Sequence, residues 1–369
     1  MIRWALRTLM AEPAATLASA LGLATALFLV AFLEGVFVGI SEEVVRYLER
    51  SDAEVWVMGK RVRNMHMATS FVAASSLAAV RDMEGVAEAT PILYLNTMVE
   101  VGDDYNWFAY IVGTMPGAPR GRAWAAVKGR RVPQRGEAVV PRILAAKGNL
   151  DLGDEVTITD RRYRIVGLSE ETFSMANSVV FLHWDDVADL TGQQTGASYV
   201  LVKAKTGTSP VELAGRIARE VDEVAAFDKA TFVAADRALA LHMGAELIAS
   251  MTLVGAVVGA LVVGWTMFVL VSRRRHELAV AKALGASNRA VVAAVALQAL
   301  ALTLIGYGIA LVVALPVEGL VTHAVPEVTV GFSANSLLRL GLVALAVALL
   351  AALVPARRVL KLDPAEVFA

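Results

Sequence analysis

The side chains that could carry chemistry in this chain are few, and their spacing excludes the common catalytic sites. There is no cysteine, which rules out disulfides, thiolate zinc sites, iron–sulfur clusters and cysteine nucleophiles. The phosphate-loop pattern G-x-x-x-x-G-K-[ST] does not occur, and Gly59-Lys60 lacks both the upstream glycine and the following Ser or Thr. His276-Glu277 has no second histidine at zinc-protease spacing. We therefore expect no catalytic residue, no metal site and no ATP hydrolysis by the chain itself.

Three soft or borderline ligands stand together at Met65, His66 and Met67. Thioether sulfur and imidazole suit haem iron or copper, so one hypothesis makes this segment a contact for a substrate, including a haem-like one. The alternative is a loop between a strand and a helix, in which three neighbours share no role. The sequence leaves both readings open.

A carboxylate, Glu34, directly follows the apolar run from Pro13 to Leu33. Charges inside a membrane are costly and often functional, so Glu34 could meet the polar or cationic part of an amphipathic substrate. Phe28 and Phe32 would then hold the substrate's apolar body. The alternatives are a carboxylate that reaches into the lipid headgroups and phenylalanines that face neighbouring helices.

The composition requires a membrane. Hydrophobic residues make up 57% of the 369 residues and mean hydropathy is +0.58, well above soluble domains. A net charge of -1 gives no reason to expect a nucleic-acid partner. A membrane span needs about 20 apolar residues, and four runs qualify. They are Pro13–Leu33, Leu247–Ser272, the stretch between Arg289 and Glu318, and the shorter stretch between Arg339 and Arg357.

Lysine and arginine near the runs predict orientation, because they favour the cytoplasmic side. The loop between the third and fourth runs holds only Arg339. With four spans, every basic flank falls on one side, so both termini are expected in the cytoplasm. A cleaved signal peptide at the first run is the alternative, but that run is longer than such peptides use. The basic flanks are Arg3 and Arg7, then Arg273, Arg274, Arg275, Lys282 and Arg289, then Arg357, Arg358 and Lys361.

The middle of the chain has a different composition, with frequent charges and short apolar runs. We expect residues 1–40 to form a cytoplasmic N-terminus and the first helix, 41–240 an α+β domain outside the membrane, and 241–369 the remaining three helices. Asp160-Arg161-Arg162 is predicted to turn a hairpin. The predicted strands are 53–58, 92–101, 107–113, 155–158, 163–168, 179–182 and 198–203, and the predicted helices are 71–83, 142–147, 185–190 and 210–221.

The loop after the second run has the most specific pattern. A basic cluster is followed by Leu278, Ala281 and Leu284 at helical spacing, and Gly285 is expected to end this short helix. Ser287 or Asn288 would cap the next helix. Such a helix offers an apolar side to a partner; the alternative is a plain loop on the headgroups.

This pattern resembles the FtsX/MacB-type ABC permeases, also called type VII or mechanotransmission permeases. The family's signature is a basic cluster, then Glu277, then Lys282 to Ser287 as Lys-Ala-Leu-Gly-Ala-Ser in this chain. Its C-terminal pattern is similar to Pro355–Arg358 and Asp363–Glu366. A weaker match to the family's periplasmic core domain runs through Glu137–Gly148, Leu152–Ile158 and Tyr163–Leu168.

The resemblance implies a homodimer with two copies of an ABC ATPase, which alone would bind ATP and Mg²⁺. A coupling helix seated on that ATPase would include Glu277, Leu278, Ala281, Lys282, Leu284 and Gly285. Only Met1 to Glu12 precede the first run, so the ATPase is expected to be a separate subunit. No cofactor is expected on the chain itself.

Around Ala53–Phe71 the sequence is most similar to the DevC and HrtB branches, linked to glycolipid and haem efflux. The implied function is a permease in the cytoplasmic (inner) membrane that uses ATP hydrolysis to extract or export an amphipathic substrate, such as a glycolipid, lipid or haem. A periplasmic membrane-fusion protein is an optional further partner, and lipid surrounds the helices. The alternatives are an FtsX-like permease that transports nothing and regulates a cell-envelope enzyme, and a sensor or membrane anchor without an ATPase.

Overall fold

The chain folds as two units, each with its own core, in a computed structural model that describes residues 11, 13–66, 68–102, 105–173, 178–325 and 328–360. The helical unit holds the residues up to Gly39, Gly244–Ala324 and the residues from Val330 onward. The inserted domain holds Ile40–Met243 together with Val325–Thr329. The unit boundaries fall inside two long helices, α2 (Pro13–Arg50) and α7 (Lys229–Arg273).

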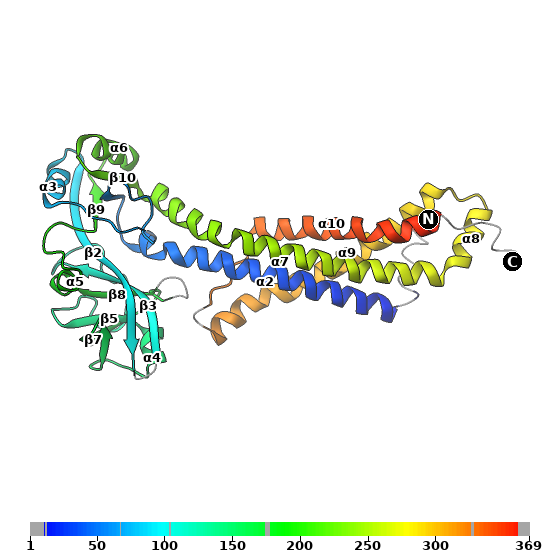
Figure 1. Cartoon of the computed structure of the whole chain (residues 1–369), viewed down its shortest axis with the longest axis horizontal. Coiled ribbons are helices and arrows are strands. Elements are labelled where there is room, and N and C mark those ends of the chain that lie inside the picture. The colour runs from blue at the N-terminus through cyan, green and yellow to red at the C-terminus, as the bar shows by residue number, and fades with distance from the viewer. Residues whose placement is uncertain are drawn as a thin grey trace. The chain divides into compact units, whose positions relative to one another are not determined.

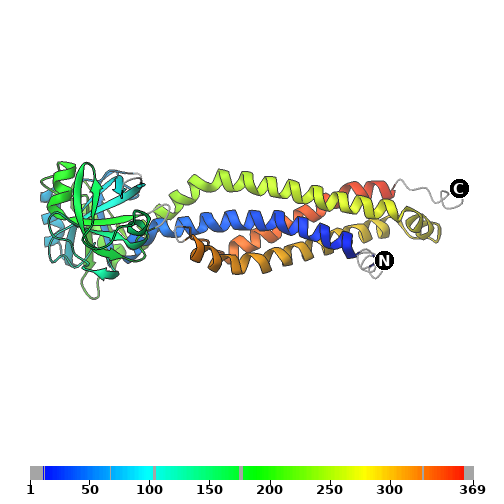
Figure 2. The same ribbon diagram turned by 90° about the horizontal axis from the view of Figure 1, so that it is seen from below.

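The helical unit is built from four long apolar helices, which Figures 1 and 2 show running alongside one another. They are α2, α7, α9 (Asn288–Ala324) and α10 (Ala334–Leu360). Each contains a stretch long and apolar enough to cross a membrane: Thr16–Arg50, Gly244–Arg273, Asn288–Val321 and Ala334–Arg357. The prediction of four spans with an α+β domain after the first is confirmed.

Small residues let these helices approach closely, as expected where lipid supplies no hydrophobic drive between helices. A Cβ atom at Gly255 of α7 would lie 2.2 Å from Val30 Cγ2 of α2. A Cβ at Gly306 of α9 would lie 3.0 Å from Leu23 Cδ2. The core between the helices is aliphatic and includes Leu27 and Met267.

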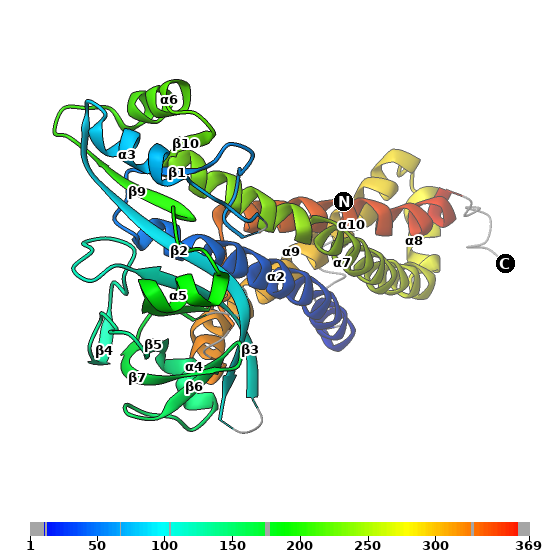
Figure 3. The same cartoon turned by 60° about the vertical axis from the view of Figure 1, so that its left-hand side comes forward.

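The inserted domain is built on one mixed sheet, seen in Figure 3, in which the long strand β2 links two halves. The strand order is β10-β1-β9-β2-β3-β8-β5-β7-β4, and β6 pairs with β2 and β7. The strands are β1 (Val55–Gly59), β2 (Val86–Val101), β3 (Tyr105–Thr114), β4 (Ala126–Gly129), β5 (Glu137–Pro141), β6 (Glu155–Ile158), β7 (Arg161–Ser169), β8 (Val179–His183), β9 (Tyr199–Ala204) and β10 (Val224–Asp228).

Strand β1 is buried on both faces, because alternate side chains enter different cores. Val55 and Val57 pack beneath α3 (Ala74–Asp82) and α6 (Pro210–Glu220), in a core with Leu77 and Ile217. Trp56 and Met58 face the end of α2 and the start of α7, in a core with residues that include Leu48 and Phe232. A third core joins the other half of the sheet to α4 (Arg142–Lys147) and α5 (Trp184–Thr191).

The predicted strands and helices of this domain all occur, β6 and α4 with the predicted ends and the others with shifted ends, but three strands were missed. β4, β5 and β10 are four or five residues long; β5 is buried throughout and β4 is mostly exposed, so neither shows the alternation that marks a half-buried strand. β2 begins at Val86 rather than Ile92, because the strand continues through Pro91.

The hairpin turn was predicted one to two residues too late. Thr159 and Asp160 occupy the turn, with φ of 47° and 65°, whereas Arg161 and Arg162 already pair in β7 with Ile158 and Thr157 of β6. Two positive φ angles in a two-residue loop match the twist of the flanking strands.

Candidate functional site

Glu34 lies in the helical unit and forms an ion pair that the sequence analysis missed. Its side chain is only 8% exposed, and its Oε1 lies 2.9 Å from Nη2 of Arg339 on α10. The Arg339 guanidinium is not oriented to donate a hydrogen bond to this oxygen, so Glu34 Oε1 has no hydrogen-bond partner among the residues described. Glu34 ends the first predicted span and Arg339 begins the fourth, both at the predicted outer side of the membrane. Two opposite charges at the same predicted depth were the signal from which this pair could have been predicted.

The segment before α10 holds this corner of the helical unit in place. The N–H of Gly331 donates to the Gly35 carbonyl at 2.9 Å, and Phe332 packs so closely that a Cβ at Gly35 would lie 2.9 Å from its ring. Ser333 and Ser336 exchange hydrogen bonds, with the Ser336 N–H donating to Ser333 Oγ at 3.1 Å, and this caps α10. The backbone next to both members of the ion pair is therefore held by hydrogen bonds, at Gly35 beside Glu34 and at the start of α10 before Arg339.

A pocket of about 590 Å³ opens beside this ion pair between α2, α7 and α10. Glu34 and Arg339 supply its charges and Thr252 a hydroxyl, while aliphatic side chains such as Val30, Leu253 and Leu350 form most of the wall. A pocket that is apolar over most of its wall and charged at one place suits an amphipathic molecule. The same arrangement leaves the ion pair within reach of a polar headgroup.

The structure does not bring Phe28 and Phe32 to this pocket. The two rings stack on each other at 6.0 Å, and Phe28 packs against the helical core. On an α-helix, residues two positions apart point about 200° away from each other, so Phe32 and Glu34 lie on opposite sides of α2.

Of the Met65–Met67 segment, Met65 and His66 are described and Met67 lies outside the described residues. Met65 is 1% exposed and belongs to a core of the inserted domain, so its sulfur is not available to a ligand. The His66 side chain is 9% exposed, and its Nδ1 lies 3.2 Å from Oδ1 of Asp236 on α7. In the part of the chain that the structure describes, no three His, Cys, Asp or Glu side chains are grouped for a metal.

The predicted coupling helix is present as α8 (Arg275–Ala283), but its apolar side is divided. Leu278 is 1% exposed and packs with Val271, Val291 and Val295 inside the helical unit. Leu284, by contrast, is 84% exposed. The predicted stripe of Leu278, Ala281 and Leu284 therefore does not form one exposed surface.

The other residues of the predicted coupling helix are at least partly exposed on α8 or lie at its end. Glu277 is half-exposed and lies 3.4 Å from Arg274 Nη1, and Ala281 and Lys282 are half-buried. Gly285 has φ of +95°, and its N–H donates to the Lys282 carbonyl at 3.0 Å. The N–H of the next residue, Ala286, donates to the Ala281 carbonyl at 2.9 Å, which completes a Schellman cap. Gly285 ends the helix as predicted.

Ser287, rather than Asn288, caps the following helix. Its Oγ accepts from the Ala290 N–H at 3.2 Å, and α9 begins at Asn288. A helix ended by a left-handed glycine and followed at once by a capped helix gives a sharply defined corner between α8 and α9. That corner presents Leu284 to solvent.

Comparison with known proteins decides the family. A model of the MacB-like periplasmic core domain matches residues 15–220, and a model of the FtsX-like permease C-terminal domain matches residues 249–364. The chain belongs to the FtsX/MacB-type ABC transporter permeases. The Asp363–Glu366 part of the C-terminal pattern lies outside the described residues.

Similar proteins span nearly the whole chain. An uncharacterized ABC transporter permease of Mycobacterium tuberculosis is 25% identical over 352 residues, which cover 94% of this chain and 93% of the relative. A second one from the same species is 26% identical over 296 residues, covering 79% and 77%.

Among solved structures, the extracellular domain of the noncanonic ABC-type transporter YknZ from Gram-positive bacteria matches with 12% identity and a TM-score of 0.36. It covers 43% of this chain and 90% of that structure. The periplasmic region of MacB from Actinobacillus actinomycetemcomitans matches with 13% identity and a TM-score of 0.35, covering 51% and 94%.

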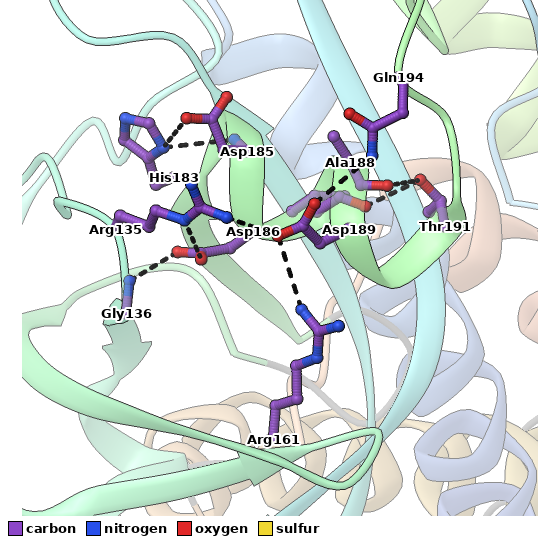
Figure 4. Close-up of polar contacts among 11 residues, drawn as sticks. Arg135, Gly136, Arg161, His183, Asp185, Asp186, Ala188, Asp189, Thr191 and Gln194 are labelled. Carbon is purple, nitrogen blue, oxygen red and sulfur yellow. Dashed lines mark hydrogen bonds and ion pairs between the residues drawn. The ribbon is translucent and has the colours of Figure 1, made fainter.

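A charged cluster in the MacB-like domain of this permease, shown in Figure 4, is structural. Asp186 of α5 accepts from the Gly136 N–H at 2.8 Å, and Arg135 reaches Asp189 Oδ2 at 2.7 Å. His183 Nδ1 caps α5 by accepting from the Asp185 N–H. Burial raises the pKa of Asp186, against the Gly136 hydrogen bond and the charge of His183, which lower it. The cluster fixes α5 to the loop before β5.

Proposed function

We propose that this permease drives the extraction or export of an amphipathic substrate, using ATP hydrolysed by a separate ATPase subunit. The observation that carries the proposal is the pocket between α2, α7 and α10, with its aliphatic wall and its Glu34–Arg339 ion pair. An acyl chain or other apolar body fits the wall, and the ion pair can exchange its internal contact for one with a headgroup. Membership of the ABC permease family supports the ATP-driven part.

In this proposal the chain itself is not catalytic and carries no cofactor. Two copies of the permease and two copies of the ATPase form the complex in the cytoplasmic (inner) membrane, and ATP and Mg²⁺ bind to the ATPase. Both termini and α8 face the cytoplasm, where the exposed Leu284 and Glu277 contact the ATPase. A membrane-fusion protein can extend the path on the outer side.

The test is purification of the permease from native membranes with identification of the co-eluting ATPase, followed by mass spectrometry of bound lipids and an absorption spectrum. Bound lipid is expected from a lipid-like substrate, and a Soret band from a haem-like one. Glu34→Ala should reduce the bound substrate and its stimulation of ATP hydrolysis about tenfold. Phe32→Ala, on the opposite side of α2 from Glu34, is the control and should change neither.

Two results would contradict the proposal. Glu34→Ala with unchanged bound substrate and unchanged stimulation would remove the pocket from the substrate path. A complex that hydrolyses ATP without any amphipathic ligand, and that activates a cell-envelope hydrolase, would favour the regulatory alternative.

A further inference from the structure

The pocket between α2, α7 and α10 lies wholly within the helical unit and extends far along α10. Its wall includes Arg339, Val343, Val347 and Leu350, which recur on one face of this helix. Leu350 lies eleven positions after Arg339, which is about 16 Å at 1.5 Å per residue. The hydrocarbon core of a bilayer is about 30 Å thick, so the pocket is about as long as one leaflet is deep. An acyl chain of a membrane lipid has this length.

The apolar wall of the pocket is open to the side. Leu253 of α7 and Leu342 and Leu350 of α10 line the pocket and are each more than half exposed. In a membrane span, an exposed leucine meets lipid or a neighbouring chain instead of water. An acyl chain can therefore enter the pocket sideways from the bilayer and remain in apolar surroundings throughout.

The polar end of the pocket carries two opposite charges and no net charge. Glu34 and Arg339 are the ionisable side chains of its wall within the described part of the chain, with Oε1 and Nη2 2.9 Å apart. A head group of one sign would add an uncompensated charge at the edge of the hydrocarbon, which is costly. A head group that carries both signs adds none. The charge balance therefore favours a zwitterion.

Arg339 is free to bind the anionic half of such a head group. Its side chain is 64% exposed, and its contact with Glu34 lacks the alignment of a hydrogen bond. A guanidinium group has five N–H donors in a fork that matches two oxygens of a phosphate. A phosphate can therefore bind Arg339 while Glu34 stays beside it.

Glu34 supplies a fixed negative charge for the cationic half. Its side chain is only 8% exposed, so it is held in place. Where the dielectric constant is low, a carboxylate attracts an ammonium group over several ångströms without a directed hydrogen bond. A sugar head group would need many hydrogen-bond partners, and Thr252 is the one other polar side chain that the described wall offers. The wall therefore suits charge pairing better than recognition of hydroxyl groups.

We propose that this pocket selects a zwitterionic phospholipid, with its phosphate on Arg339, its ammonium group beside Glu34 and an acyl chain along α10. The proposal rests on the proposed function in taking this pocket as the substrate site, and it names the head group of the substrate. Selection among head groups needs no ATPase. A pocket that prefers a different amphiphile would contradict this proposal and leave the proposed function standing.

The test is native mass spectrometry of the full-length permease in decyl maltoside, an uncharged detergent. The probes are three didecanoyl lipids in equal amounts: zwitterionic phosphatidylcholine, anionic phosphatidylglycerol and cationic trimethylammonium-propane. The wild type should retain phosphatidylcholine about tenfold more than either other lipid, because only this lipid pairs with both charges. Arg339→Gln should shift the preference to the cationic lipid, and Glu34→Gln should shift it to the anionic one.

Two further variants separate recognition from folding. Glu34→Arg combined with Arg339→Glu keeps both charges in the pocket, so the preference for phosphatidylcholine should return. Arg50→Gln is the matched control, since Arg50 is similarly exposed and its ion pair with Glu171, at 3.0 Å, lies outside the pocket. Equal retention of the three lipids by the wild type would mean lipid held only at the helix surface and would overturn the proposal. So would a wild-type preference for either singly charged lipid, or one order of retention shared by the wild type and both glutamine variants at Glu34 and Arg339.

Discussion

At the scale of single residues, Glu137 at the start of β5 is the centre of a charge network in the inserted domain. Its side chain is 7% exposed and accepts hydrogen bonds from Arg130 at 2.7 and 2.8 Å, Arg164 at 3.1 Å and the Gln134 N–H at 2.9 Å. Burial alone would raise the pKa of Glu137, but the hydrogen bonds from Gln134, Arg164 and Arg130 outweigh it and lower the pKa below its ordinary value near 4.5. The carboxylate form is the one that the fold stabilises.

Glu137→Gln should destabilise the domain in a pH-dependent way. Because the folded pKa is lowered, the stabilisation is complete above about pH 4.5 and is lost as pH falls through the folded pKa. Both arginines are half-exposed, so we expect a loss of about 1–2 kcal/mol at pH 7, or a melting temperature lower by about 3–6 °C. At lower pH the wild-type carboxyl protonates and the two proteins should converge.

Tryptophan fluorescence is a suitable probe, since Trp56, Trp107, Trp124 and Trp184 lie in the inserted domain. Glu155→Gln is the control, because Glu155 is exposed and its contact to Arg162 is 3.7 Å long. A Glu137→Gln deficit that persists undiminished at acid pH would show that the carboxylate charge is not the stabilising feature.

Single residues were also where prediction from the sequence reached its limit. Glu34 was recognisable, because an ionisable residue at a membrane span is costly and often functional. Its partner Arg339 lies far along the chain, and only helix packing shows that the two meet. Asp236 was not recognisable, since a single acid in a long helix is usually solvated, whereas here it is fully buried against Met65.

At the scale of elements, α8 and its corner depend on two leucines in opposite environments. Leu278 belongs to the packed core of the helical unit, and Leu284 projects from the cap. Both leucines were predicted to lie on one face because a single helix was assumed to continue through Leu284. The helix instead ends at Ala283, so Leu284 lies outside it. The cap itself was predictable, since glycine favours the left-handed conformation that Gly285 adopts.

Aspartate at these two positions should therefore have different effects. Leu278→Asp buries an unpaired charge and should abolish accumulation of folded permease. Leu284→Asp should leave expression and melting unchanged but reduce co-purification of the ATPase, and ATP turnover by the complex, at least about tenfold. Val211→Asp, at an exposed aliphatic residue of the inserted domain, controls for added surface charge. Full ATPase binding by Leu284→Asp would exclude this corner as the contact.

At the scale of the whole molecule, the sequence was most informative about what crosses the membrane. Long uncharged runs predict spans from bulk solvation alone, and all four occur as helices. The architecture of the inserted domain was less accessible, because the order of its strands depends on pairings between distant segments such as β1 with β10. The alternation of apolar and polar residues along a strand predicts which side chains are buried, but it does not predict which other strand pairs with it.

Topology is the last property that the charge pattern predicts and that experiment can settle. The loop between α7 and α9 carries Arg273, Arg274, Arg275, Lys282 and Arg289, whereas the only basic residue near the α9–α10 connection is Arg339. The positive-inside rule then places the α7–α9 loop in the cytoplasm and the inserted domain outside.

Because the chain has no cysteine, one substitution gives one reactive thiol. Val211→Cys lies on the exposed first turn of α6. It should react with a membrane-impermeant maleimide in cells whose outer envelope has been made permeable and whose cytoplasmic membrane is intact. Asn288→Cys, exposed where α9 begins, should react only after lysis. Labelling of Asn288→Cys before lysis would reverse the orientation, and it would move α8 and Leu284 to the side of the membrane where no ATP-hydrolysing partner could reach them.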